Sequence, residues 1–205
     1  MRSSRVLPFA LLLLVAASTR AADPLDQQHT DLAAKSPAGV SFILTLDKAA
    51  YHAGERIAVT LTFTSSIDGK YTCDMATYDR SGRMFEDTYF LDPADAADPL
   101  RDYFANVGGF MLGGLSQIPP LAAKPLELHV DLNEWLRIDH PGTHHLFAAS
   151  TRVQIAGDTS PRLATASNIV TFEILPPDPA WSQAQLADIQ KILDGHPEPS
   201  ERTAA

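Results

Sequence analysis

The sequence has one cysteine, few basic residues and, beyond its N-terminus, no long apolar run. Cys73 has no second cysteine to pair with, so an internal disulfide is excluded and stability rests on a hydrophobic core. Lys and Arg number 16 against 25 Asp and Glu, a formal net charge of −9 at pH 7. Phosphate binding needs clustered basic side chains, so this charge argues against nucleic acid or anionic lipid as a partner.

The one apolar run, at the N-terminus, is typical of a secretory signal. Arg2 and Arg5 precede apolar residues 6–17, a run shorter than the roughly 20 residues that a bilayer requires. Thr19 and Ala21 then offer the small side chains that a signal peptidase accepts. We expect residues 1–21 to be a signal peptide and the rest to be exported, periplasmic or extracellular, without membrane insertion after cleavage. An uncleaved N-terminal anchor is the alternative.

The mature chain divides into four parts by pattern. Residues 22–39 are polar and small without periodicity, which predicts a flexible leader. Residues 40–176 hold seven or so short strand-like segments with turn signals between them, the pattern of an all-β, two-sheet sandwich. Residues 177–195 have helical spacing and predict an amphipathic C-terminal helix, packed on or near the sandwich. Residues 196–205 predict a disordered tail.

Two segments give the clearest local signals. Residues 55–65 alternate strictly, with Ile57, Val59, Leu61 and Phe63 at every second position, so these four should line a buried strand face. Before the helix, Asp178 is an N-cap residue and Pro179 suits the first helical position.

A short run before this strand resembles a known family. Asp47-Lys48, Tyr51 and Gly54-Glu55 lead into an alternating strand, as in macroglobulin-type and related bacterial immunoglobulin-like domains. A second stretch, residues 139–144, is similar to the Pro-Gly-x-Tyr corner of such sandwiches, with His144 where the tyrosine would stand. The resemblance implies an immunoglobulin-like sandwich of an exported bacterial protein. It implies no particular activity.

The sequence has few patterns that suggest catalysis or metal binding. No Gly-x-Ser-x-Gly motif is present, and no catalytic residue is predicted, so the protein is not expected to be an enzyme. His140, His144 and His145 with Asp139 are the densest group of metal-capable side chains. On a strand His144 and His145 point to opposite faces, and we expect no metal there. An alternative site would join His140 and His144 with Asp139 or His129.

An acidic group surrounds the long connection over residues 92–124. It consists of Glu86, Asp87, Asp92, Asp95, Asp98 and Asp102. Its spacing matches no calcium-binding loop, so no calcium and no other cofactor is predicted. Cys73 alternates with Tyr71 and Met75 and is expected to be a buried structural thiol.

The same connection is the best candidate for a contact surface. Long connections inside a compact domain are uncommon and are usually functional or flexible. This one is rich in glycine and carries an apolar set that we predict to form a contact loop: Phe104, Phe110, Met111, Leu112 and Leu115. We therefore expect a non-catalytic binding or accessory module of the bacterial envelope, with an envelope protein as partner. The alternatives are a structural spacer domain and, less favoured, a sandwich-based metal-dependent hydrolase.

Export can be tested directly. Expressed with its own N-terminus in a bacterium, the protein should leave the cytoplasm and lose residues 1–21, because the apolar run is too short to remain as an anchor. N-terminal sequencing of the exported fraction checks the cleavage site. An intact Met1 in the cytoplasmic fraction would contradict the prediction.

Overall fold

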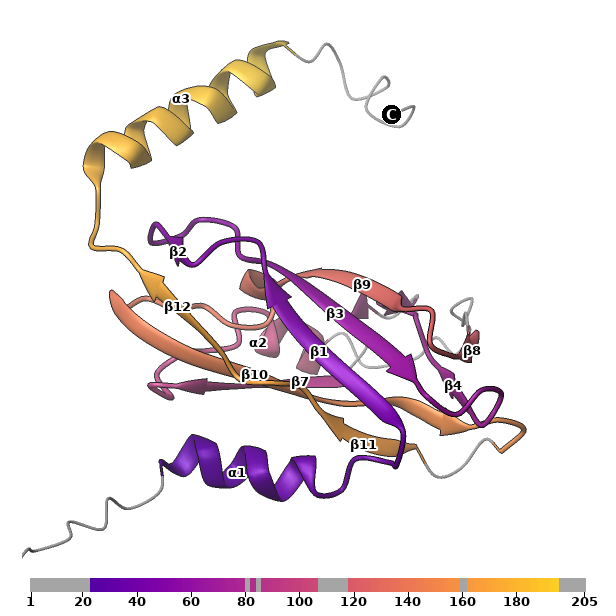
Figure 1. Ribbon diagram of the computed structural model, residues 1–205. Helices are drawn as coiled ribbons and strands as arrows, with labels where there is room; N and C mark the ends of the chain where they lie inside the picture. The colour runs from indigo at the N-terminus through magenta and orange to yellow at the C-terminus, as the bar shows by residue number, and fades with distance from the viewer. Residues whose placement is uncertain (1–22, 80–81, 84–85, 107–117, 159–161, 196–205) are drawn as a thin grey trace, which may run out of the picture.

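The computed structural model describes residues 23–79, 82–83, 86–106, 118–158 and 162–195. Most of it is β-structure in two curled sheets (Figure 1). The small sheet has the order β1 (Val40–Leu46), β3 (Ala58–Ser65), β9 (Leu126–Asp131). The large sheet has the order β2 (Ala50–Tyr51), β12 (Val170–Ile174), β10 (Gly142–Ile155), β4 (Tyr71–Cys73), β8 (Pro120–Leu121). β10 also pairs with β7 (Asp87–Asp92) and β11 (Leu163–Ala166), while β5 (Tyr78–Asp79) and β6 (Gly82–Arg83) pair with each other.

One hydrophobic core is shared by the two sheets. From the small sheet and the residue before β3, Ile57, Val59, Leu61 and Phe63 enter it with at most 2% of their surface exposed. This confirms the buried face predicted for the alternating strand. The large sheet supplies the opposing side chains, among them Tyr71, Cys73, Leu146, Val153 and Phe172. Because each sheet buries its apolar side chains against the other, we expect neither sheet to be stable alone.

β10 is the strand around which the large sheet is built. Along one edge it pairs first with β12 and then with β11; along the other it pairs first with β7 and then with β4. Pairing with β7 runs as far as Ser150 and pairing with β4 starts at Val153, and the register with β11 shifts over the same interval. At residues 151–152 the strand therefore changes partner from β7 to β4 along one edge and shifts its register with β11 along the other.

Arg152 occupies this change of partners and is only 1% exposed. Its Nε donates to both carboxylate oxygens of Asp87, at 3.1 and 2.9 Å, and its Nη2 lies 2.8 Å from Asp87 Oδ2. Its Nη1 donates to the backbone oxygens of Asp74, at 2.9 Å, and Ala76, at 2.5 Å. One guanidinium thus joins β10 to the start of β7 and to the chain that leaves β4.

The run that resembles macroglobulin-type domains forms the corner between β1 and β3. The Tyr51 hydroxyl donates to Asp47 Oδ1 at 2.6 Å and accepts the backbone N–H of Lys48 at 3.1 Å. Glu55 accepts the backbone N–H of His52 at 2.9 Å and pairs with Lys48. Gly54 has a φ of +82°, a conformation that a side chain would strain. These residues are therefore explained by the corner that they build.

Helix α1 (Pro24–Ala33) lies in the segment for which the sequence analysis expected an irregular, flexible leader, and it corrects that expectation. Asp23 accepts the backbone N–H of Leu25 at 3.0 Å and caps the helix. Leu25 is buried, and the His29 ring meets Phe147 edge-on at 5.1 Å. Phe147 is fully buried but points away from the shared core. The helix is ordered because it covers this outer side of the large sheet, below the sheets in Figure 1.

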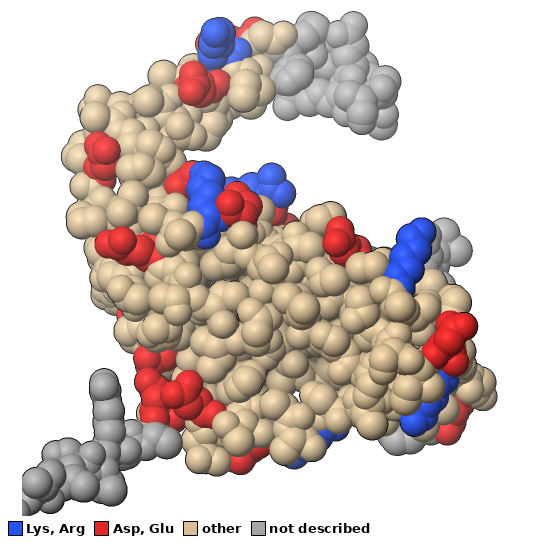
Figure 2. Space-filling model, in the orientation of Figure 1, with Lys and Arg blue, Asp and Glu red and all other residues tan. Residues whose placement is uncertain are grey.

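Helix α3 (Pro179–Gly195) forms at the predicted C-terminal segment, and Asp178 caps it through the N–H groups of Ala180 and Trp181. It does not pack on the sheets as expected, because none of its residues is buried. Its contact with the body is the stacking of Trp181 on His52, with ring centroids 4.5 Å apart. In Figure 1 α3 lies above the sheets, and Figure 2 shows a gap between most of the helix and the body.

Short elements complete the chain. Helix α2 (Arg101–Asn106) lies within the long connection, and a 3-10 helix, η1 (Leu132–Glu134), follows β9. Within the described ranges, no helix combines the length and the apolar character needed to cross a membrane.

The buried Arg152–Asp87 pair gives a stability prediction. Arg152→Met should lower the free energy of unfolding by about 3–5 kcal/mol, because Asp87 would stay buried without its cation. Adding Asp87→Leu should recover part of that loss, since the uncompensated charge is then gone. Urea unfolding of the three variants Arg152→Met, Asp87→Leu and the double variant measures the coupling.

Arg56 provides the matched control, because it also pairs with an aspartate, Asp131, but is exposed. Arg56→Met should cost less than about 1 kcal/mol. Additive losses from Arg152→Met and Asp87→Leu would contradict the interpretation of the pair as one coupled unit.

Candidate functional site

Three hollows adjoin one another around η1, at the end of the small sheet where β9 finishes and the corner before β3 begins. The first, which we call the β9 notch, has a volume of about 220 Å³ and is lined by Arg56, Thr77, His129, Val130, Asp131, Glu134, Trp135 and Arg152. The second, the η1 groove, has a volume of about 430 Å³ and is lined by Gly54, Arg56, Pro99, Leu100, Asp131, Asn133 and Glu134. The third, the corner hollow, has about 260 Å³ and shares Gly54, Pro99 and Asn133 with the groove.

Two sets of side-chain contacts, made by Arg56 with Asp131 and by Asn133, hold this end of the molecule together. Arg56 Nε donates to Asp131 Oδ1 at 2.6 Å, and both residues border the notch and the groove. Asn133 accepts the backbone N–H of Ile57 at 2.7 Å and donates to the backbone oxygen of Glu55 at 3.0 Å. Its amide therefore continues the β3–β9 ladder beyond the end of β9 and fixes η1 against the corner. Sequence reasoning missed all three residues.

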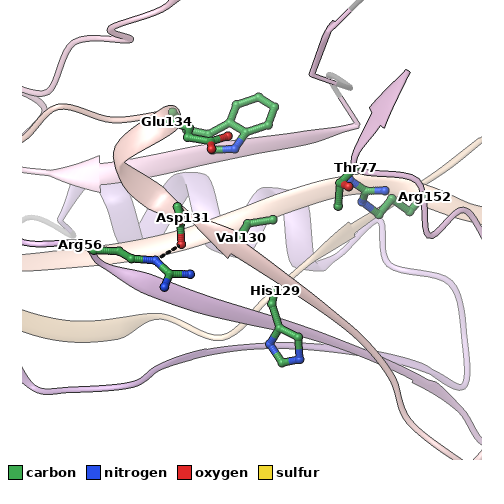
Figure 3. A pocket seen from close by; sticks show the side chains of 8 residues that line it. Arg56, Thr77, His129, Val130, Asp131, Glu134 and Arg152 are labelled. Atoms are coloured by element: carbon green, nitrogen blue, oxygen red, sulfur yellow. Dashed lines mark hydrogen bonds and ion pairs between the residues drawn. The ribbon is translucent and has the colours of Figure 1, made fainter. Parts of the chain in front are cut away.

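Figure 3 shows how the β9 notch is arranged. Arg56 and Asp131 lie on one side of it, joined by their ion pair, while Thr77 and Arg152 lie on the other. His129 Nδ1 lies 3.1 Å from the hydroxyl of Thr60 on the outer face of the small sheet. The notch therefore opens between the last strand of the small sheet and the neighbouring part of the large sheet.

The charges at this end are engaged with one another. A hydrogen bond from Lys48 is the main cause that holds the pKa of Glu55 below its usual range, so Glu55 stays ionised beside the corner hollow. Arg56 offsets Asp131, and the charge of Arg152 is offset by Asp87. These charges are therefore offset within the protein.

The long connection contributes directly to the hollows. Pro99 borders the groove and the corner hollow, and Leu100 borders the groove. Ala97 and Arg137 exchange backbone hydrogen bonds of 3.3 and 2.8 Å, which tie the connection to the chain beyond η1. The described part of this segment is therefore fixed against η1.

The predicted contact loop falls largely outside the described residues. Phe110, Met111, Leu112 and Leu115 all lie in the stretch that the structure does not describe. Phe104 is half-buried on α2, where the neighbouring ring of Tyr103 meets it edge-on at 5.1 Å. The lining residues that the connection supplies, Pro99 and Leu100, were not among those predicted.

His144 and His145 lie on opposite faces of β10, as their adjacent positions in a strand predict. His144 is buried and its Nε2 lies 3.0 Å from the backbone oxygen of His140, while His145 contacts Thr171 on the opposite face. His129 lies on the other sheet. Among the residues that the structure describes, no three His, Cys, Asp or Glu side chains converge as metal ligands.

Members of the acidic group have separate structural roles. Asp87 pairs with Arg152, Glu86 pairs with Arg162, and Asp98 accepts the backbone N–H of Leu100 at 3.0 Å.

Cys73 is fully buried in the core, and burial raises the pKa of its thiol to about 12. A thiol of this kind is protonated at neutral pH and does not act as a nucleophile.

Comparisons with known proteins reveal only slight similarity. No protein-family model matches the sequence, and no curated protein is significantly similar to it. Among solved structures, the alkylpurine DNA glycosylase AlkC of Pseudomonas fluorescens, bound to DNA containing an abasic site analog, overlaps 68% of this chain and 31% of its own, at 16% identity and a TM-score of 0.30. The β-glucosidase of Listeria innocua, in complex with glucose, overlaps 67% of this chain and 16% of its own, at 13% identity and a TM-score of 0.28. This chain thus spans under a third of either protein, and overlaps this slight carry no argument about function.

The buried thiol gives a pH prediction. A folded-state pKa of about 12 against an ordinary value of 9.0 means that Cys73 favours the folded state fully below pH 9. That contribution is lost as the pH rises from 9 to 12, because the thiol of the unfolded chain ionises first. Between pH 8 and pH 10 the wild type should lose about 1 kcal/mol more stability than Cys73→Ala.

Urea unfolding at the two pH values, with a reductant present, measures this difference. Burial also raises the pKa values of Tyr51 and Tyr89, but these tyrosines are common to both proteins and cancel. Equal losses in wild type and variant would show that the thiol is not the group responsible.

Proposed function

We propose that this protein is an exported, non-catalytic binding or accessory module of the bacterial envelope, built on an immunoglobulin-like β-sandwich. Its partner is a protein, which it contacts at the end of the molecule around η1. The observation that carries the proposal is the set of three adjoining hollows there, to which the long connection contributes Pro99 and Leu100.

The composition of this end supports a protein partner. The η1 groove combines the apolar side chains of Pro99 and Leu100 with Arg56, Asp131 and an asparagine, the mixture found where protein surfaces meet. The groove is open to solvent, and two further hollows continue it, which suits an extended contact more than an enclosed small molecule.

Three features support an immunoglobulin-like sandwich. The two sheets share one core, and the Asp47–Tyr51 and Lys48–Glu55 contacts build a corner at the run on which the family resemblance rests. His144 with its bond to the His140 backbone stands where such sandwiches have a corner tyrosine.

A spacer domain that presents α3 is the second candidate. None of the residues of α3 is buried, and four large apolar side chains, Leu186, Ile189, Ile192 and Leu193, are each more than half exposed. Exposed apolar residues in such a group are typical of contact surfaces. In this alternative the helix is the contact element and the sheets only place it.

Site-specific photo-crosslinking in the cell distinguishes these functions. A photoreactive amino acid in place of Leu100, in the η1 groove, should trap a partner protein in the envelope. The same residue in place of Ile43 is the matched control, because Ile43 is also apolar and 44% exposed but lies on the outer face of β1, away from the hollows. We expect a discrete crosslinked band at position 100 and none at position 43.

A third position, Ile189 on α3, tests the alternative. A band at position 189 with none at position 100 would overturn the contact surface around η1 and favour the spacer. The proteins substituted at positions 43, 100 and 189 should all melt within a few degrees of the wild type, since surface substitutions usually change stability by less than about 0.5 kcal/mol.

A further inference from the structure

The edges of the two sheets differ in how well they are blocked. Along the outer edge of β1, Asn168 accepts the backbone N–H of Leu44 at 2.9 Å and donates to its oxygen at 3.2 Å, so a side-chain amide occupies the place of another strand. β2 and β8 are two residues long, and Pro120 in β8 lacks an N–H. Within the described residues β7 pairs only with β10, and Trp135 packs against its Tyr89. A side-chain amide at the edge, short edge strands and proline are usual ways in which proteins protect sheet edges.

β9 has no such protection among the described residues. Its register with β3 and the bond from Leu132 N to Ile57 O show which residues bond to β3: Leu126, Leu128 and Val130. The three residues between them, Glu127, His129 and Asp131, therefore direct their backbone N–H and C=O groups away from the sheet. These groups have no backbone partner within the described part of the chain. The β9 notch opens along this same edge.

We propose that the outer edge of β9 binds an extended segment of a partner protein as an additional strand, with basic side chains facing Glu127 and Asp131. This proposal deepens the proposed function and rests on it, because the edge is continuous with the η1 groove through Arg56 and Asp131. Backbone hydrogen bonds supply the affinity in such strand addition, and alternate side chains supply the specificity.

The charge along the edge selects the partner. Glu127, Asp131 and Glu134 carry three carboxylates near this edge; Asp131 already pairs with the exposed Arg56, and the charge of Arg152 is offset by Asp87, so the balance of these side chains is negative. Residues directly opposite each other in an antiparallel pair have Cβ atoms about 4.5–5.5 Å apart, so lysines four positions apart would face Glu127 and Asp131. The two partner residues that alternate with these would have their side chains on the opposite face of the strand, toward Val130 and the notch. Apolar side chains fit there.

A second copy of this chain fits the same edge poorly. Two β9 strands paired antiparallel about His129 would place Glu127 of each copy opposite Asp131 of the other. Like charges in directly opposed positions are destabilising, and each chain already carries a net charge of −9. The carboxylates that favour a basic segment therefore oppose self-pairing.

A defined peptide probe tests the proposal on the mature protein. The probe is a fluorescent peptide with the central sequence Lys-Val-Thr-Val-Lys, and its control has the same composition in the order Lys-Lys-Thr-Val-Val, which sends one lysine to the notch face. Fluorescence anisotropy should show the first peptide binding about tenfold more tightly. Equal affinities would mean that only net charge attracts the peptide, and would overturn the proposal.

Two variants of the edge sharpen the test. His129→Pro removes an outward N–H without touching the β3–β9 bonds, and Glu127→Lys reverses a charge that the peptide should face; each should weaken binding about tenfold or more. Thr45→Lys is the matched control, because Thr45 is exposed on the outer face of β1 at the far edge of the same sheet, and it should leave binding unchanged. If His129→Pro fails to fold, Glu127→Lys against Thr45→Lys still decides.

Amide hydrogen exchange by NMR locates the bound strand. The amides of Leu126, Leu128 and Val130 should already be protected in the free protein. Those of Glu127, His129 and Asp131 should become protected only when the peptide is added. Protection elsewhere, or a dimer in solution that His129→Pro dissociates, would overturn the proposal. Should the peptide fail while crosslinking at Leu100 still traps a protein, the strand-addition inference falls and the proposed function stands.

Discussion

The large sheet depends on one buried ion pair. At residues 151–152 β10 changes partner from β7 to β4 along one edge and shifts its register with β11 along the other, and such an irregularity interrupts the ladder of backbone hydrogen bonds. The Arg152 guanidinium bonds to the backbone oxygens of Asp74 and Ala76, on the chain that leaves β4, and is itself neutralised by Asp87. A pair with this geometry adds little to stability over an apolar core, and we expect it to favour the observed register of β4 and β7 against β10. The same residue forms one wall of the β9 notch, so the register of the large sheet also sets the shape of that hollow.

Local sequence signals predicted the elements that local physics determines. Strict alternation identified β3, and the Asp178-Pro179 cap identified the start of α3. The same signal, Asp23-Pro24, precedes α1, but that helix has few apolar residues and is ordered through Leu25 and the covered Phe147. The helix is ordered by its packing on the outer face of the large sheet, and that face is defined only by the assembled fold. The packing of α3 was overestimated for the converse reason, since an apolar stripe indicates that a helix has a partner without saying that the partner is in the same chain.

The residues around η1 were not recognisable from the sequence because their roles are long-range. Arg56 meets Asp131 and Asn133 meets Ile57 across 75 and 76 positions of the chain. Each is an ordinary polar residue near a turn, with no motif around it. The connection over residues 92–124 was singled out by its length and its glycines, and its described part does reach the hollows, through Pro99 and Leu100 rather than through the apolar residues predicted. A signal in composition thus indicated the region, whereas the individual contacts require the fold.

The contrast between β1 and β9 connects the fold to the proposed contacts. Both are edge strands of a three-stranded sheet, with six or seven residues and similar alternation. The outer edge of β1 is blocked by the side-chain amide of Asn168, which bonds to the strand's backbone. β9 instead has carboxylates on its outer face and an open hollow beside it. Charged residues alone protect an edge against copies of the same chain, because the charges oppose one another, yet they attract a segment of opposite charge. In the strand addition that we propose, an edge protected in this selective way would oppose self-association and still leave the backbone groups of Glu127, His129 and Asp131 accessible to one class of partner.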